Sequence, residues 1–445
     1  MNKDNELLPW EHAVFRKLLG LAWPIILSSL SFNLMTLVNA LLISHSGTAQ
    51  LAGVGFGGVL GFMLLSFIYG VLRAAKTLVS HCVGAGAKER IPNYQGAALT
   101  LALIGGFLCL AVAELVALVV PYITASAEAG LMTQRYLAIG MLAAPVMVWN
   151  TALREVCFGE GDSRTPMIAT VASNLTNIAA AAFLLFVLKL GVAGAAIATM
   201  CAHAVDCLIL TRAQYRRHGL VNIGRSGDLA EVWKLGLPCG LQFSLEVGAM
   251  TLLAGLIAGL GENAMAANQI ASNIVQFCLL PVAAIAESGA VLAGQAMGAN
   301  KHRLVMKLAR LSLACACSYT IVCACAMALA PDMVSGFFSS DGELVGACRS
   351  VLVMAALFVI IDATNMVARS ILRSVGDLRI PALVGVITAW ALTPPATWLF
   401  AYRLDMGLFG SWLGMCLQTA AGAAVLWYRL KHTQWHSPDL ARSEA

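Results

Sequence analysis

The sequence predicts an all-α polytopic membrane protein with twelve transmembrane helices in two homologous six-helix bundles. Hydrophobic residues make up 59% of the 445-residue chain and charged residues only 11%, whereas a soluble domain carries about 25% charged residues. Residues 18–72 contain no Asp, Glu, Lys or Arg. A bilayer requires about 20 apolar residues per spanning helix, and no soluble core requires so long an uncharged run. In addition, the second half of the chain repeats the first.

The repeat extends over nearly the whole chain. Residues 47–85 align with residues 261–299 at a constant shift of 214, which also pairs Pro24 with Pro238. Further along, Asn150, Arg154 and 161–166 match Asn365, Arg369 and 376–381 at a shift of 215, and 191–194 match 407–410 at 216. Two halves of like orientation would be related by a pseudo-two-fold axis along the membrane normal. Many transporters are built in this way, with their site between the halves.

Twelve apolar segments can be drawn, and each is long enough to cross a bilayer with some tilt. They are 18–43, 51–82, 96–120, 131–157, 166–188, 191–212, 232–259, 265–297, 308–330, 345–373, 380–402 and 406–430. Proline interrupts several of them, at Pro24, Pro145, Pro238, Pro281 and Pro394-Pro395. Proline frees backbone groups, which a membrane protein tolerates where protein or a wet cavity satisfies them. Simple bending for helix packing explains each of them equally well.

Basic residues predict the orientation. The connections on one face carry Lys88, Arg90, Arg164, Arg212, Arg216, Arg217, Arg225, Lys301, Arg303, Lys307 and Arg379. Those on the opposite face have only Lys189 and Arg403 as basic residues. The positive-inside rule places the first face and both termini in the cytoplasm. We therefore expect a cytoplasmic (inner) membrane protein with an N-terminal segment (1–17), two lobes (18–212 and 232–430), a cytoplasmic linker (213–231) and a cytoplasmic tail (431–445).

The sequence lacks the residues that several classes of protein need for their function. The 13 cysteines lie almost all inside apolar segments, and Cys315 and Cys317 point to different faces of a helix, which suits packing better than metal binding or disulfides. The sequence has no phosphate-binding glycine loop, nucleophile–base pair or zinc box. We therefore expect no enzyme, no cofactor and no ATP, and the net charge of +5 gives no indication of nucleic-acid binding. The expected partners of this monomer are a small-molecule substrate and the lipid bilayer.

Two carboxyl groups within the predicted spans indicate a cation-coupling site. Glu246 lies near the middle of the seventh span, with Gln242 one turn before it, and no cation is near it in sequence. Asp362 lies a little past the middle of the tenth span, and Asn365 and Arg369 continue its helix face. Ionisable groups at such depth cost roughly 2.5–3.5 kcal/mol on insertion scales, so they indicate function by default. The two acids could exchange H⁺ or transiently bind Na⁺, unless Asp362 forms a structural pair with Arg369 or an amide.

A second charged group lies in the second span, where Arg73 and Lys76 share a helix face. The shift of 214 residues places Arg73 in register with Glu287. If both side chains face the pseudo-two-fold axis, they would form a gate pair that closes one side of a central cavity. The alternative is that Arg73 and Lys76 extend to the lipid headgroups at the cytoplasmic end.

The chain resembles the multidrug and toxic compound extrusion (MATE) family. The resemblance rests on Leu21 through Pro24, Leu34 through Asn39, Gly47 through Ala52, Gly236 through Pro238 with Glu246, Ala266 through Ile270, Gly294 through Ala299, and Asp362 through Pro381. It implies two six-helix lobes, a V-shaped cavity, and export of small, often cationic compounds in exchange for H⁺ or Na⁺. Glu246 and Asp362 match the second-lobe acids of the NorM-type branch.

The same resemblance implies a non-titrating first lobe. Asn39 stands where many relatives carry an Asp, and Ala181 replaces the Asp that follows Asn177 by four residues in the branch that couples through its first lobe. We therefore expect Asn39, Asn177, Gln242 and Asn365 to be polar residues of the substrate cavity. The alternatives are a dedicated exporter of one metabolite, possibly an anion that Arg73 and Lys76 would favour, and a non-transporting membrane protein.

Overall fold

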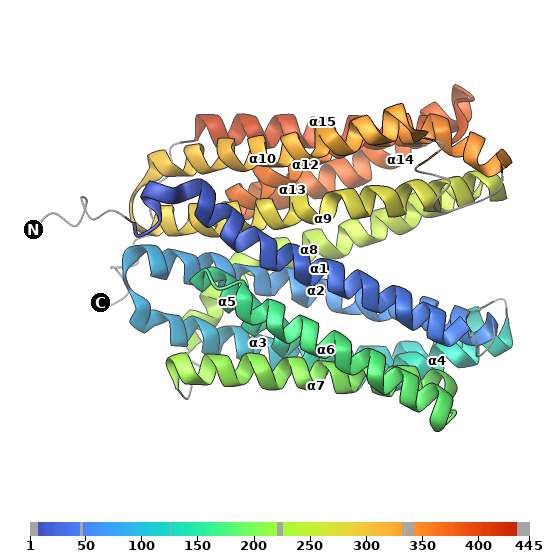
Figure 1. Ribbon diagram of the computed structural model, residues 1–445, viewed down its shortest axis with the longest axis horizontal. Helices are drawn as coiled ribbons and strands as arrows, with labels where there is room; N and C mark the ends of the chain where they lie inside the picture. The colour runs from blue at the N-terminus through green and yellow to red at the C-terminus, as the bar shows by residue number, and fades with distance from the viewer. Residues whose placement is uncertain are drawn as a thin grey trace, which may run out of the picture. The chain divides into compact units, whose positions relative to one another are not determined.

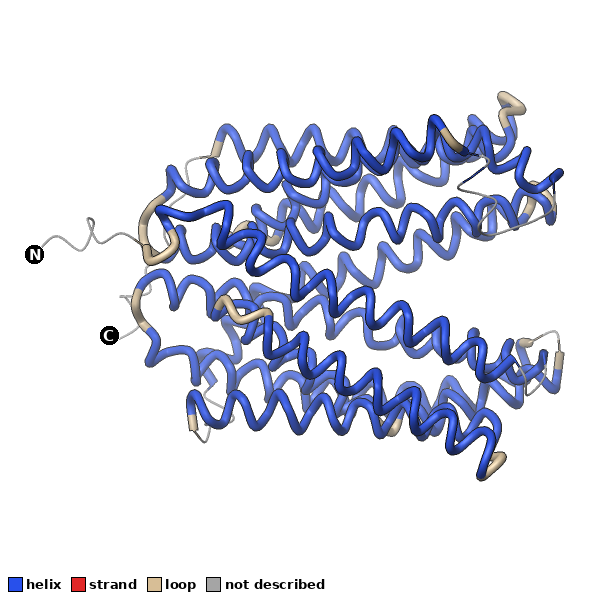
Figure 2. The backbone as a smooth tube through the Cα atoms, viewed as in Figure 1, coloured by secondary structure: helices blue, strands red, loops and turns tan. Residues whose placement is uncertain are grey.

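A computed structural model describes residues 8–44, 48–124, 126–219, 226–331, 333 and 342–433. Within these ranges the chain is helical apart from short connections (Figure 2). Eleven helices are long and apolar enough to cross a membrane, and the bent pair α4 and α5 makes a twelfth when it is counted as one span. The prediction of a polytopic all-α protein with twelve spans is confirmed. Residues 1–7, 220–225 of the expected linker and 434–445 of the expected tail lie outside the described ranges.

The helices follow the predicted segments in order. In the first half they are α1 (Val14–Ser44), α2 (Thr48–Ala85), α3 (Ile91–Ile123), α4 (Ala127–Met141), α5 (Ala144–Glu160), α6 (Arg164–Ala182) and α7 (Gly191–His218), with short elements η2 (Glu11–Ala13), η3 (Lys88–Arg90) and η4 (Phe183–Val187). In the second half they are α8 (Ser226–Ala258), α9 (Glu262–Gly298), α10 (His302–Leu329), α12 (Gly342–Ser374), α13 (Arg379–Ile387), η5 (Thr388–Leu392), α14 (Thr393–Thr397), η6 (Trp398–Arg403) and α15 (Gly407–His432).

The chain divides into two compact units, one made mostly of the second half and one mostly of the first. Each unit also includes the first residues of the helix that begins the other half. Unit 1 contains the described residues of Met1–Trp23, Gly84–Gly86 and Leu245–Ala445, and unit 2 contains Pro24–Val83 and Ala87–Ser244. Thus α1 starts in unit 1 and α8 starts in unit 2. The lobe boundaries expected from the sequence, 18–212 and 232–430, stay a prediction.

The segment just before α1 is fixed to unit 1 by two polar contacts, one with α9 and one with the connection between α9 and α10. The indole Nε1 of Trp10 donates a hydrogen bond of 2.9 Å to Gln295 Oε1, and the Glu11 carboxylate pairs with Lys301. Trp10 is buried. These contacts explain why the segment before Pro24 belongs with the second half of the chain.

The start of α8 is fixed to unit 2 by close helix packing. A Cβ atom at Gly70 of α2 would lie 2.5 Å from the carbonyl oxygen of Cys239, and one at Gly236 would lie 2.2 Å from the carbonyl oxygen of Val71. Only glycine permits so close an approach of two backbones, as is common where membrane helices pack. In addition, the hydroxyl of Tyr94 on α3 donates to Glu231 Oε2 over 2.9 Å.

Prolines break the fourth and eleventh spans. The predicted span 131–157 consists of α4 and α5, which are bent by 54° just before Pro145. The neighbouring helix α3 has Gly106 at this point, and a Cβ atom there would lie 2.5 Å from Pro145 Cα. The glycine therefore makes room for the bend. In the predicted span 380–402, π-helical η5 precedes Pro394-Pro395, which cannot donate to the preceding turn. The π-helical segments η4 and η6 begin at positions that the repeat aligns, Phe183 and Trp398.

Each unit has its own apolar interior and an apolar exterior. In unit 1, α9, α10, α12 and α15 run side by side (Figure 1) around a core that includes Phe358 and Trp412, whose rings pack edge to face. On the outside, α3 exposes Phe107, Leu108 and Leu115 to about 60% each. Continuous exposed apolar surface of this kind suits hydrocarbon rather than water.

Candidate functional site

An ion pair joins two spanning helices of unit 1 at Glu246. Arg369 of α12 donates from Nη1 to both carboxylate oxygens of Glu246 on α8, over 2.9 Å and 3.2 Å. Both side chains are about one-fifth exposed. No cation lies near Glu246 in the sequence, and in the structure its partner comes from a helix more than 100 residues away.

Asp362 lies beside this pair. It precedes Arg369 by two helical turns on α12, so the two residues share a face. Long side chains in a helix point back toward its N-terminus, which carries the Arg369 guanidinium toward the level of Asp362. Asp362 is within electrostatic reach of both Arg369 and Glu246. The structural pair considered for Asp362 is therefore not the one that forms, since the hydrogen bonds of Arg369 Nη1 go to Glu246.

The surrounding helices hold both partners in place by hydrogen bonds to backbone carbonyls. Trp390 of η5 donates from Nε1 to the carbonyl of Leu245, the residue before Glu246, over 3.0 Å. Trp427 of α15 donates to the carbonyl of Thr364 over 3.0 Å. These indole contacts fix α8 and α12 at the residues that flank the acids, so the site has a rigid frame.

Asn365 makes a structural contact from the same face of α12. Its Nδ2 donates to the carbonyl of Thr419 on α15 over 3.1 Å, and the residue is only 3% exposed. Asn150, its repeat equivalent, donates to the carbonyl of His203 on α7 over 2.9 Å. His203 and Thr419 are themselves equivalent at the shift of 216 residues. The duplicated chain therefore fastens two helices by the same bond in each half.

Unit 2 contains a buried ion pair that the sequence analysis missed. Arg154 of α5 donates from Nη2 to both carboxylate oxygens of Asp206 on α7, over 3.1 Å and 2.9 Å, and from Nη1 to Thr170 Oγ1 over 2.6 Å. Asp206 is 4% exposed. A signal was present, because Asp206 is the sole acid of the predicted span 191–212 and the reasoning applied to Glu246 covers it equally.

The two basic residues of α2 have different environments within unit 2. Lys76 Nζ lies 3.4 Å from Glu155 Oε2, and this acid of α5 was also missed from the sequence. The guanidinium of Arg73 lies over the ring of Phe243, with its carbon 4.7 Å from the ring centroid. The alternative that these two residues extend to the lipid headgroups stays a prediction. Glu287 belongs to unit 1, so its proposed gate with Arg73 stays a prediction.

The remaining polar residues of the expected substrate cavity lie in unit 2. Asn177 of α6 is buried and donates from Nδ2 to Thr199 Oγ1 over 3.4 Å. The amide oxygens of Asn39 and Asn177 are buried without a hydrogen-bond partner in the described part of the chain, as expected of groups that bind water or a ligand. Gln242 is fully buried on α8. Their role as cavity residues stays a prediction.

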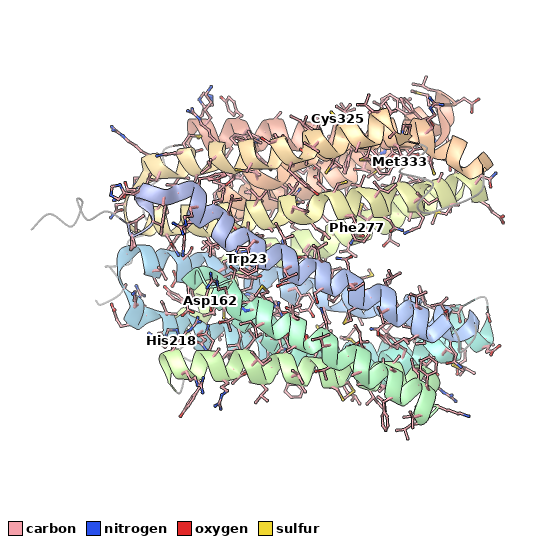
Figure 3. All side chains as sticks on the ribbon, viewed as in Figure 1. Trp23, Asp162, His218, Phe277, Cys325 and Met333 are labelled. Carbon is pink, nitrogen blue, oxygen red and sulfur yellow. The ribbon has the colours of Figure 1, made fainter. Side chains whose placement is uncertain are left out.

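No three His, Cys, Asp or Glu side chains gather into a metal site among the described residues. At the cytoplasmic end expected for α5 and α7, acids and bases instead pair with one another. Asp162 pairs with Arg217, and Glu160 pairs with both Arg217 and His218; Figure 3 shows Asp162 and His218 at the same end of unit 2. This cluster closes a helix junction rather than forming a ligand site.

Comparison with known proteins supports the duplication and the fold. The family model MatE matches residues 24–183 and, a second time, residues 238–399. The two matches begin at Pro24 and Pro238, the pair that the repeat aligns. A probable multidrug resistance protein NorM of Pseudomonas syringae pv. tomato is 29% identical, with 96% of each chain covered. Another from Burkholderia pseudomallei is 26% identical, with 92% of this chain and 91% of that protein covered.

Among solved structures, a crystal structure of the Vibrio cholerae MATE transporter VcmN superposes with a TM-score of 0.88 at 20% identity, covering 94% of this chain and 97% of that chain. At that identity the likeness shows the fold alone. The family model, by contrast, covers well over half of the sequence and recognises both halves. The chain therefore belongs to the MatE family, the MATE transporters that its sequence motifs resemble.

Proposed function

We propose that the protein is a secondary active antiporter that exports small, drug-like and often cationic organic compounds across the cytoplasmic membrane in exchange for H⁺ or Na⁺, by alternating access. Membership of the MatE family and the NorM relatives, which are named as multidrug resistance proteins, support export. The observation that carries the coupling proposal is the Glu246–Arg369 ion pair beside Asp362, within spanning helices. The proposal needs neither ATP nor an enzymatic step, and it takes the chain as a monomer with both termini in the cytoplasm.

In this proposal the two acids share one tethered cation. While Arg369 holds Glu246, the neighbouring Asp362 is the carboxylate open to an incoming H⁺ or Na⁺. Once Glu246 takes up a proton or Na⁺, it no longer holds Arg369, whose guanidinium can turn to Asp362 on its own helix face. In each arrangement Arg369 pairs with one carboxylate, and the other is compensated when it binds H⁺ or Na⁺, in a setting where an isolated charge is costly. Binding of the coupling ion would thereby alter the tie between α8 and α12, the helices that the pair joins.

The test is gradient-driven efflux from proteoliposomes that contain the full chain. Glu246→Gln and Asp362→Asn should each abolish efflux of a cationic dye under an imposed H⁺ or Na⁺ gradient, while the amount of protein inserted into the membrane stays close to wild type. Glu128→Gln is the matched control, because Glu128 is exposed at the start of α4, and it should transport normally. Efflux at the wild-type rate in both site variants would refute second-lobe coupling.

A further inference from the structure

Among the described residues of unit 2, the Arg73 cation has no acidic partner. Arg154 is held by Asp206 and Lys76 by Glu155. Arg73 makes neither an ion pair nor a hydrogen bond with any residue in the described ranges, and its one recorded contact is the stacking on Phe243. The donors of its guanidinium, five N–H groups in a planar fork, are therefore left for another acceptor.

The guanidinium lies away from both ends of α2. The Cα atom of Arg73 is twelve residues before the end of α2 at Ala85, about 18 Å along the axis, and helical side chains point toward the N-terminus, away from that end. The contacts agree, because Phe243 also packs edge to face on Phe62, with 5.9 Å between ring centroids. Phe62 is three turns closer to the start of α2. Arg73 thus extends away from the nearer end of α2.

Packing alone does not explain a cation at this position. The repeat places Glu287 at the equivalent position of α9, so the duplicated helix does not require a basic residue there. An Arg within a spanning helix is costly unless a partner or water compensates it, which marks it as a functional residue by default. Stacking on one aromatic ring compensates only part of that cost.

We propose that Arg73, with Phe243 and Phe62, binds the carboxylate of an aromatic organic anion on unit 2. The guanidinium fork would accept the carboxylate in a bidentate geometry, which is the strong form of this contact. Phe62 is 49% exposed and would cover the apolar ring of the ligand, next to Phe243. The inference rests on the proposed export function and extends its substrate class from cations to aromatic carboxylates.

Equilibrium binding of radiolabelled naphthoate to the purified full chain in detergent tests this site. Naphthamide, of the same shape without the charge, is the comparison ligand. Wild type should prefer naphthoate. Arg73→Gln should lower the affinity for naphthoate roughly ten- to a hundred-fold, as loss of hydrogen bonds to a charged group predicts. It should leave the affinity for naphthamide unchanged. Arg212→Gln, which removes an exposed Arg of α7 in the same unit, should change neither affinity.

A second variant keeps the test decisive if Arg73→Gln does not fold. Arg73→Lys retains the charge but loses the planar fork and the stacking, so its naphthoate affinity should lie between those of wild type and Arg73→Gln. Equal wild-type affinity for naphthoate and naphthamide would overturn the site, and so would unchanged naphthoate affinity in a folded Arg73→Gln or Arg73→Lys protein. Because binding is measured without a gradient, it does not depend on ion coupling, and a failure of ion coupling can be told apart from a failure of this site.

Discussion

Arg154 and Arg369 occupy equivalent positions in the two halves of the chain, yet they bind carboxylates on non-equivalent helices. Arg154 binds Asp206 on α7, and Arg369 binds Glu246 on α8. The repeat places Gly422 where Asp206 stands in the first half. A Cβ atom at Gly422 would lie 2.8 Å from Asn365 Nδ2, so a side chain there would displace Asn365 from its bond to Thr419. The second half therefore receives its acid from α8, and its ion pair joins a different pair of helices.

The pairing of Arg369 with Glu246 rather than Asp362 can be measured by double-mutant cycles. We expect Arg369→Met with Glu246→Gln to show a coupling energy of at least about 1 kcal/mol, and Arg369→Met with Asp362→Asn a smaller one, because the first pair shares direct hydrogen bonds. Thermal unfolding of the purified protein without substrate provides the stabilities. Larger coupling to Asp362 would contradict the arrangement.

The ion pair of unit 2 should be structural rather than a coupling site. Asp206→Asn leaves the Arg154 guanidinium without its buried counter-charge, and we expect a loss of about 3 kcal/mol, at the low end for broken buried pairs because Arg154 is 26% exposed. Arg154→Met combined with Asp206→Leu should recover most of that loss, since a well-packed apolar pair replaces a desolvated ion pair. The double variant should still respond to an imposed ion gradient in proteoliposomes. Loss of gradient dependence in a stable double variant would instead assign coupling to unit 2.

The helices and the acids of the second half could be predicted from the sequence, because apolar length and buried charge are local properties. The partners that these side chains find on other helices could not be predicted. Spacing along one helix suggested Asp362 for Arg369, whereas the geometry of α8 decided for Glu246. Likewise, no local pattern in residues 8–23 indicates that they belong with the second half, because that assignment depends on Trp10 meeting Gln295, 285 residues away.

Asn365 illustrates how the repeat can correct a functional interpretation. From the sequence it is a polar residue of the cavity, but the bond that it shares with Asn150 indicates fastening of neighbouring helices. We expect Asn150→Ala and Asn365→Ala to lose similar stability, about 0.6–1.7 kcal/mol, the range for hydrogen bonds between membrane helices. Substrate affinity, measured by binding in detergent, should change in neither. A selective loss of affinity in Asn365→Ala would restore the cavity role.

The last prediction concerns the junction between α5 and α6, outside the spans. Asp162 follows Gly161, which ends α5 at a φ of 81° that favours glycine, and its Oδ1 accepts from the backbone amides of Arg164 and Thr165 over 3.0 Å and 3.1 Å. Burial by itself would raise the pKa of Asp162, but the hydrogen bonds from Thr165 and Arg217 outweigh it and hold the pKa below the ordinary value of 3.8.

Because the folded protein favours the ionised form, the stabilisation by Asp162 is present above the unfolded pKa and is lost as the pH falls through the lower, folded value. Asp162→Asn should therefore be less stable than wild type near pH 6, by about 1 kcal/mol for a weakened helix cap. The difference should shrink below about pH 4, where wild type also becomes neutral at this position. Thermal midpoints of both proteins between pH 6 and pH 3 measure it, and a constant difference across that range would show that the charge of Asp162 does not stabilise the junction.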